Sequence, residues 1–148
     1  MGLATAPLRF AAASPTCQPL GLERESEMEA KYLSCIPIFT VKDPAKARDF
    51  YVDKLGFKVL FEWGSPITYL GLERNNVCVH LNSESNSRQE PGGGSISVIT
   101  DEVDNLYAHC INQGVEITIA PDDRPYGLRD FGVKDVDGNI INFGCEVK

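Results

Sequence analysis

The chain repeats one pattern of helix-boundary residues, and this repeat constrains the fold more than any other feature. Asp43 and Gly56 bracket one helical run, and Asp101 and Gly114 bracket another at the same internal spacing, 58 positions later. Aspartate favours the position just before a helix, and glycine the position just after its last turn. In both copies, one strand-like apolar run precedes the helix and three follow it. The sequence therefore predicts two tandem βαβββ modules.

Apolar periodicity and turn residues give the expected elements. The first copy has strands at 35–41, 57–63, 67–72 and 77–81 and a helix between 43 and 56. The second copy has strands at 96–100, 115–120, 128–134 and 140–146, a helix between 101 and 114, and a loop at 121–127. The alternation of Phe57, Val59, Phe61 and Trp63 predicts that these side chains share one packed face of their strand.

Neither copy is large enough to bury a good core alone, so both must share one. We expect one α+β domain of mixed sheets, with modules at 28–82 and 95–148 and a flexible linker at 83–94. Two such sheets leave a curved cleft between them, which is a natural site for a small molecule. The alternative is a ferredoxin-like α+β domain whose two halves resemble each other by chance. The matched spacing of the helix-boundary residues favours the repeat.

Residues 1–27 differ from the rest, because they are rich in alanine, proline and small residues without sustained periodicity. We expect this segment to be a disordered extension. It can also be an over-extended reading frame, with Met28 as the natural start.

Composition excludes several classes of protein. The 14 basic and 21 acidic residues give a net charge of −7 without a basic cluster, which argues against nucleic-acid binding. No apolar run approaches the length of a membrane span, so no membrane partner is expected. The five cysteines are odd in number and widely spaced without a C-x-x-C pair, which indicates reduced thiols and a cytoplasmic location.

Three residues of the first copy are candidates for ligand contact. Trp63 and Tyr69 lie on neighbouring strands, and aromatic rings that line a cleft can stack on a planar ligand. His80 can contact the ligand or carry a proton, or be a satisfied histidine on a sheet face. For Phe61, on the same strand as Trp63, we expect core filling.

The second copy offers Asp122, Asp123 and Tyr126 in the expected loop at 121–127. Paired carboxylates there can attract a cationic ligand to the mouth of the cleft, whereas a plain polar turn is the simpler interpretation.

Two stretches carry a family resemblance. Residues 36–57, with the strand–Asp–helix–Phe-Tyr and Leu-Gly-Phe pattern, resemble the first module of the vicinal-oxygen-chelate superfamily of glyoxalases, bleomycin resistance proteins and extradiol dioxygenases. Residues 126–131 (YGLRDF) and 135–139 (DVDGN) resemble its second module. This resemblance implies the fold but not the activity, because one fold hosts many chemistries.

The resemblance also implies where metal-using members hold their ion. Those positions are Ile36, His80, Gly94 and Asn142 here, and only His80 is a competent ligand. A catalytic divalent ion generally needs about three protein ligands. We therefore expect no metal and no other cofactor.

The pattern of residues 36–50 is similar to that of the bleomycin-resistance branch, which implies antibiotic resistance by sequestration without metal. The expected function is binding of a cationic or aromatic small molecule in a cleft of a homodimer, with first strands exchanged between subunits. The alternative is a glyoxalase-type lyase or isomerase, or a dioxygenase, using His80 with Glu62 or Glu73 or a metal-free acid–base mechanism. A ligand-free interaction module is a third interpretation.

Overall fold

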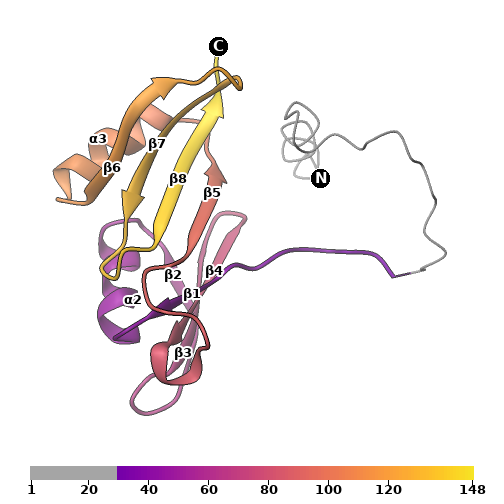
Figure 1. The fold of residues 1–148 in the computed structure, drawn as a ribbon, viewed down its shortest axis with the longest axis vertical. Coiled ribbons are helices and arrows are strands. Elements are labelled where there is room, and N and C mark those ends of the chain that lie inside the picture. Colours follow the sequence, from indigo (N-terminus) through magenta and orange to yellow (C-terminus); the bar gives the residue numbers. More distant parts are fainter. Residues whose placement is uncertain (1–29) are drawn as a thin grey trace. The chain divides into compact units, whose positions relative to one another are not determined.

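The computed structural model describes residues 30–148, of which residues 36–148 form one compact unit (Figure 1). The expected extension at 1–27 lies outside the described residues. The first module contains β1 (Ile38–Val41), α2 (Pro44–Asp53), β2 (Lys58–Trp63), β3 (Tyr69–Arg74) and β4 (Val77–Ser83). The second contains β5 (Ser95–Ile99), α3 (Val103–Asn112), β6 (Glu116–Asp123), β7 (Leu128–Lys134) and β8 (Ile140–Glu146). A short 3₁₀ turn, η1 (Glu84–Asn86), lies between the modules.

Each module forms one four-stranded mixed sheet, and the two sheets have the same topology. The strand orders are β1-β4-β3-β2 and β5-β8-β7-β6, with the first pair parallel and the others antiparallel in each sheet. The predicted α+β fold of two βαβββ modules is therefore confirmed. None of the helices in residues 30–148 is long and apolar enough to cross a membrane.

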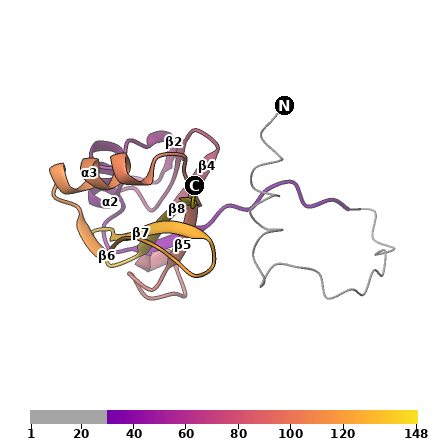
Figure 2. The same cartoon turned by 90° about the horizontal axis from the view of Figure 1, so that it is seen from above.

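Each sheet has one face covered by a helix and one open face. α2 packs on β2, β3 and β4, and α3 packs on β6, β7 and β8. Figure 2 shows the two helices side by side, and His109 Nε2 of α3 lies 2.9 Å from the carbonyl oxygen of Lys54 after α2. In β4, Val79 and Leu81 are fully buried on the covered face, while His80 lies on the open face. Period-two alternation thus separates the core from a potential ligand surface.

One hydrophobic core joins the two modules, as expected from their size. Its largest fully buried members are Phe39, Tyr51, Leu55, Leu70, Leu72, Leu81, Phe131 and Ile141. Cys110 belongs to this core, whereas Cys35, expected in an apolar strand, precedes β1 and is exposed.

The turn at residues 135–139, here called the Asp135 turn, ties the second module to the first. Asp135 Oδ1 accepts hydrogen bonds from the backbone N–H groups of residues 137, 138 and 139. Its Oδ2 accepts from the Tyr51 hydroxyl at 2.9 Å and from Asn139 Nδ2 at 2.9 Å. Asn139 Nδ2 also donates to the carbonyl of Thr40 in β1, and Asn139 Oδ1 accepts from the N–H of Gly94. One buried turn therefore fixes β1 and the start of β5 together.

The two helices begin differently, although the sequence pattern is the same. Asp43 caps α2 as predicted, because its side chain accepts from the N–H groups of residues 45 and 46. At α3 the position before the helix is Glu102, without a side-chain cap. The prediction that Asp101 starts this helix is wrong by one residue, and its carboxylate instead accepts from the Thr100 hydroxyl.

A bulge in β2 overturns the prediction that Val59 shares a face with Phe61. Val59 pairs with Leu72, but Phe61 pairs with Gly71, so Leu60 is an extra residue between them. An inserted residue reverses the side-chain alternation beyond it. Val59 therefore lies on the covered face of the sheet, and Phe61 lies on the open face.

The loop expected at 121–127 is also shorter than predicted. β6 continues to Asp123, because residues 122 and 123 pair with Asp130 and Arg129 of β7. A register shift between Ile119 and Asp122 accommodates Pro121, which cannot donate to the ladder. A hydrogen bond from the backbone N–H of Arg124 to the carbonyl oxygen of Leu128 closes the turn that remains. Similarly, β3 starts at Tyr69 rather than at 67, because the turn after Trp63 extends to Thr68, whose N–H bonds the Trp63 carbonyl.

Candidate functional site

The open face of the first sheet carries a cluster of rings. Phe61 and Tyr69 are nearly parallel, at 18° with centroids 6.1 Å apart. The imidazole of His80 stands almost perpendicular to both, at 5.2 Å from Phe61 and 5.4 Å from Tyr69. The Tyr69 hydroxyl lies 2.8 Å from His80 Nδ1. We call these three side chains the ring cluster.

Gly71 explains how the ring cluster forms on a pleated sheet. It pairs with Phe61 of β2 on one side and with His80 of β4 on the other. A Cβ at this position would overlap the Phe61 ring. Because Gly71 has no side chain, Phe61 lies across the strand and meets its two aromatic neighbours. The second sheet repeats this arrangement with Gly132 opposite Asn142.

The surface around the ring cluster is apolar and exposed. Trp63, which pairs with Tyr69, is 73% exposed, and Phe61 is 42% exposed. Ile38 pairs with His80 on the same face and is 49% exposed. Contiguous exposed apolar surface with aromatic residues marks an interaction site more often than isolated exposed side chains do. Trp63 also lies in β2, the edge strand of its sheet.

Partial burial favours the uncharged forms of His80 and Tyr69. Desolvation lowers the pKa of His80 below its usual 6.5 and raises the pKa of Tyr69 above its usual 10. The neighbouring Asn82, paired with Tyr69, has a buried Oδ1 that finds no donor within residues 30–148. On the surface itself, the ring faces adjoin the Tyr69 hydroxyl and the ring nitrogens of His80.

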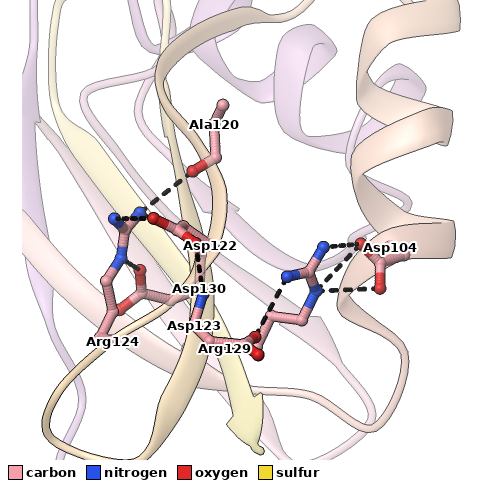
Figure 3. A network of polar contacts seen from close by, with 7 residues as sticks. All are labelled: Asp104, Ala120, Asp122, Asp123, Arg124, Arg129 and Asp130. Atoms are coloured by element: carbon pink, nitrogen blue, oxygen red, sulfur yellow. Dashed lines mark hydrogen bonds and ion pairs between the residues drawn. The ribbon is translucent and has the colours of Figure 1, made fainter.

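Of the other three predicted ligand residues, Asp122 and Asp123 lie in β6 of the second sheet and Tyr126 lies in the turn before β7. Asp122 is on the open face of this sheet, where Arg124 binds it at 3.6 Å. Arg124 Nε also donates to Asp130 Oδ1 at 2.8 Å, and the Tyr126 hydroxyl donates to Asp130 Oδ2 at 2.5 Å. These contacts raise the pKa of Arg124 and of Tyr126. Figure 3 shows Arg124 with its partners Asp122 and Asp130.

Asp123 is adjacent in sequence but belongs to a different network. Arg129 Nη1 donates to Asp123 at 3.1 Å, and Arg129 also binds both oxygens of Asp104 in the first turn of α3 (Figure 3). These hydrogen bonds raise the pKa of Arg129 and lower that of Asp104. The structure therefore brings Trp63, Tyr69 and His80 together and places Asp122 and Asp123 apart from them, on another sheet.

The comparisons with known proteins agree with this architecture. Residues 34–143 match the Glyoxalase/Bleomycin resistance protein/Dioxygenase superfamily. The chain belongs to this superfamily.

Its relatives in the superfamily include proteins that are named for antibiotic resistance or binding. The bleomycin resistance protein of Geobacillus stearothermophilus is 29% identical over 133 residues, covering 78% of this chain and 98% of that protein. The antibiotic binding protein TnmS3 of Streptomyces sp. CB03234 is 28% identical, with a TM-score of 0.65, covering 80% of this chain and all of the other. A superfamily member from Sphaerobacter thermophilus is 29% identical, with a TM-score of 0.70 and the same coverage.

The positions at which superfamily members hold a metal do not suit one here. Ile36 precedes β1 and Gly94 precedes β5, and neither has a side-chain donor. A Cβ at Gly94 would overlap the ring of Phe39, so even a small ligating side chain would not fit. His80 and Asn142 remain, and one imidazole with one amide is a poor donor set for a divalent ion. Within residues 30–148, no three His, Cys, Asp or Glu side chains are grouped for metal binding.

The carboxylates that the enzyme interpretation would recruit are not grouped with His80 either. Glu62 pairs with Leu70 on the covered face, where Arg48 Nη1 donates to it at 2.7 Å. Glu73 is on the open face but pairs with Cys78 rather than with His80.

Sequence reasoning missed Phe61 and Gly71. Phe61 was expected in the core and instead contributes a ring to the open face. The signal was present in the glycine of the sequence Tyr-Leu-Gly-Leu, because a glycine inside a strand often marks a close approach by another group.

Proposed function

We propose that this protein binds and sequesters a small molecule with a planar aromatic group on the open face of its first sheet, without chemical change to the molecule. The observation that carries this proposal is the exposed ring cluster with Trp63 beside it. Aromatic faces prefer offset-stacked or edge-to-face partners, and a ligand ring can use both orientations here.

We further propose that the ligand is cationic. The chain carries a net charge of −7, and the open face of the second sheet sets Asp122 and Asp130 against the single guanidinium of Arg124. Such a surface attracts positive charge. Asp122 and Tyr126 are the proposed contacts for the cationic part of the ligand, and Asp123 adds to the local negative potential.

The named relatives suggest the ligand class, namely an antibiotic such as bleomycin. We propose that the protein works as a homodimer in the cytoplasm, with the ligand in a cleft that the dimer completes. No cofactor is needed for this function.

Calorimetric titration of the full chain with metal-free bleomycin tests the proposal. We expect saturable binding, weakened about two- to tenfold by Trp63→Ala, because an aromatic contact contributes about 0.5–1.5 kcal/mol. Ile111→Ala is the matched control, since Ile111 is 50% exposed but lies on α3, away from the open face. Equal effects of the two substitutions, or no binding by the parent chain, would contradict the proposal.

Elemental analysis and thermal-shift titration with divalent metals separate sequestration from metal-dependent chemistry. A ligand that binds only the folded state raises the apparent melting temperature. We expect a shift with bleomycin and none with Mg²⁺, Mn²⁺, Ni²⁺ or Zn²⁺. Stoichiometric metal in the purified protein would favour the enzyme interpretation.

A further inference from the structure

The second sheet repeats the backbone geometry that forms the ring cluster. In both sheets, a bulge in the edge strand comes directly before the residue that pairs with a glycine of the neighbouring strand. In the second sheet that glycine is Gly132, which pairs with Ile119 of β6 and with Asn142 of β8. Gly132 thus corresponds to Gly71, and its neighbours occupy the places of the ring cluster.

The side chains at this second position carry hydrogen-bonding groups instead of rings. A Cβ at Gly132 would overlap both Thr118 Oγ1 and Asn142 Oδ1, so the two oxygens lie over the same residue on the open face. Ser97 of β5 pairs with Asn142 from the other side and lies on the same face. We call Thr118, Asn142 and Ser97 the polar cluster.

The polar cluster has unused hydrogen-bonding capacity. Hydrogen bonds within residues 30–148 do not involve its side chains, and its polar atoms are not among the buried ones that lack a partner. Thr118 and Ser97 are exposed, and Asn142 is partly buried. Together they supply two hydroxyls, which each donate and accept, and one carboxamide with two donor hydrogens and an acceptor oxygen. These groups therefore face solvent and can bind a ligand.

Exposed aliphatic side chains flank the polar cluster. Ile119, which pairs with Gly132, is 47% exposed, and Ile99 of β5 is 41% exposed. The nearest carboxylate along β7, that of Asp130, is paired with the guanidinium of Arg124 at 2.8 Å. A ligand for this surface needs neutral groups that both donate and accept hydrogen bonds, together with C–H surface that covers the isoleucines.

We infer that the polar cluster is a second small-molecule site, which takes a neutral polyhydroxylated ring such as a hexose or its glycoside. Each sugar hydroxyl donates and accepts, and neighbouring hydroxyls of one sugar can reach both oxygens that lie over Gly132. The C–H groups of the same ring remove the isoleucine side chains from water. A few placed polar groups beside apolar surface are typical of small-molecule sites. The inference goes beyond the proposed function, because this site lies on the other sheet and takes a ligand without charge or aromatic ring.

NMR titration of the isotope-labelled full chain tests the inference through the side-chain amide of Asn142, whose resonances are assigned by their loss from Asn142→Ala. The probes are the methyl glycosides of glucose, galactose and mannose. Tetrahydropyran is the control, because it has the same ring without hydroxyls. We expect at least one glycoside to shift these resonances saturably with a Kd of about 1–10 mM, as a few net hydrogen bonds allow. Tetrahydropyran should leave them unchanged.

Thr118→Val replaces the hydroxyl with a methyl group of similar size and should weaken glycoside binding about fivefold, the effect of one hydrogen bond. Thr68→Val is the matched control, since the Thr68 hydroxyl donates to the Trp63 carbonyl in the first module. It should bind the glycoside as the parent chain does. Urea unfolding of each variant checks the fold.

Three results would overturn the inference: no glycoside shifts the Asn142 resonances of the parent chain, tetrahydropyran shifts them equally, or folded Thr118→Val binds as tightly as the parent chain. The first two comparisons use the parent chain and do not depend on how a variant folds. Bleomycin titration judges the proposed function separately. Bleomycin binding without a glycoside shift contradicts this inference alone, and glycoside binding without bleomycin binding contradicts the proposed function alone.

Discussion

The hydroxyl of Tyr51 in α2 donates a buried hydrogen bond to Asp135 Oδ2, although the two residues are 84 positions apart in the chain. Asp135 also accepts three backbone N–H groups and the amide of Asn139. The carboxylate therefore accepts hydrogen bonds from both modules. Its removal should affect the whole fold rather than one turn.

Asp135→Ala should lower the free energy of unfolding by about 3 kcal/mol, because several buried donors lose their acceptor. Urea unfolding measures this change. Asp137→Ala is the matched control, since Asp137 is in the same turn but its side chain accepts one N–H, that of Lys42, at the surface. The control should lose less than half as much. Equal losses would contradict the central role of Asp135.

Tyr51 should make the protein sensitive to alkaline pH. Burial, and next the charge of Asp135, hold the pKa of Tyr51 well above its usual value of 10 in the folded state. A group with a raised folded pKa binds more protons folded than unfolded, so its contribution to stability is complete below pH 10 and declines above it. Unfolding measured between pH 8 and 11 should show this decline. Tyr51→Phe should flatten the profile above pH 10; an unchanged profile would show that other groups cause it.

Gly71→Ala should weaken ligand binding through Phe61. The new Cβ would overlap the Phe61 ring and force it out of the ring cluster. Gly132→Ala is the matched control, because its Cβ would meet Thr118 and Asn142 at the equivalent place in the second sheet. Both variants should lose about 1–3 kcal/mol of stability through overpacking. Only Gly71→Ala should reduce bleomycin affinity, and titration of both variants checks this.

Asp122→Asn should weaken binding of a cationic ligand in a salt-dependent manner. The expected loss in bleomycin affinity is about threefold at 0.02 M salt and negligible at 0.5 M, because salt screens exposed charges. Asp53→Asn changes the net charge equally but lies at the end of α2. It should have no comparable effect. No loss at low salt, or an equal loss from Asp53→Asn, would contradict the contact proposed for Asp122.

The sequence predicts the modules of this fold better than the details of its site. The spacing of Asp43 and Gly56, repeated at Asp101 and Gly114, predicts both helices and the order of the strands. The bulge at Leu60 is not predictable from alternation, because an extra residue leaves the apolar pattern intact while reversing the faces. This single residue is why Phe61 was expected in the core.

Long-range polar contacts set a second limit on sequence reasoning. Local motifs indicate that residues 135–139 form a turn, but not that Tyr51 reaches it. Likewise, only the fold shows that Arg124 binds Asp122 and Asp130, whereas Arg129 binds Asp104 of α3. Trp63, Tyr69 and His80 were found because aromatic residues on adjacent strands are visible in the sequence. Their role in binding stays a prediction.

The Asp135 turn also determines how the chain can be divided. A cut near residue 90 would separate two sheets of equal topology, and symmetry suggests two self-sufficient halves. Asn139, however, holds the Thr40 carbonyl of the other half, and Tyr51 would lose its acceptor. Each fragment would expose half of a shared core. Co-expressed fragments should therefore reassemble into one particle. This makes the chain a candidate for a split reporter, in which neither half folds without the other.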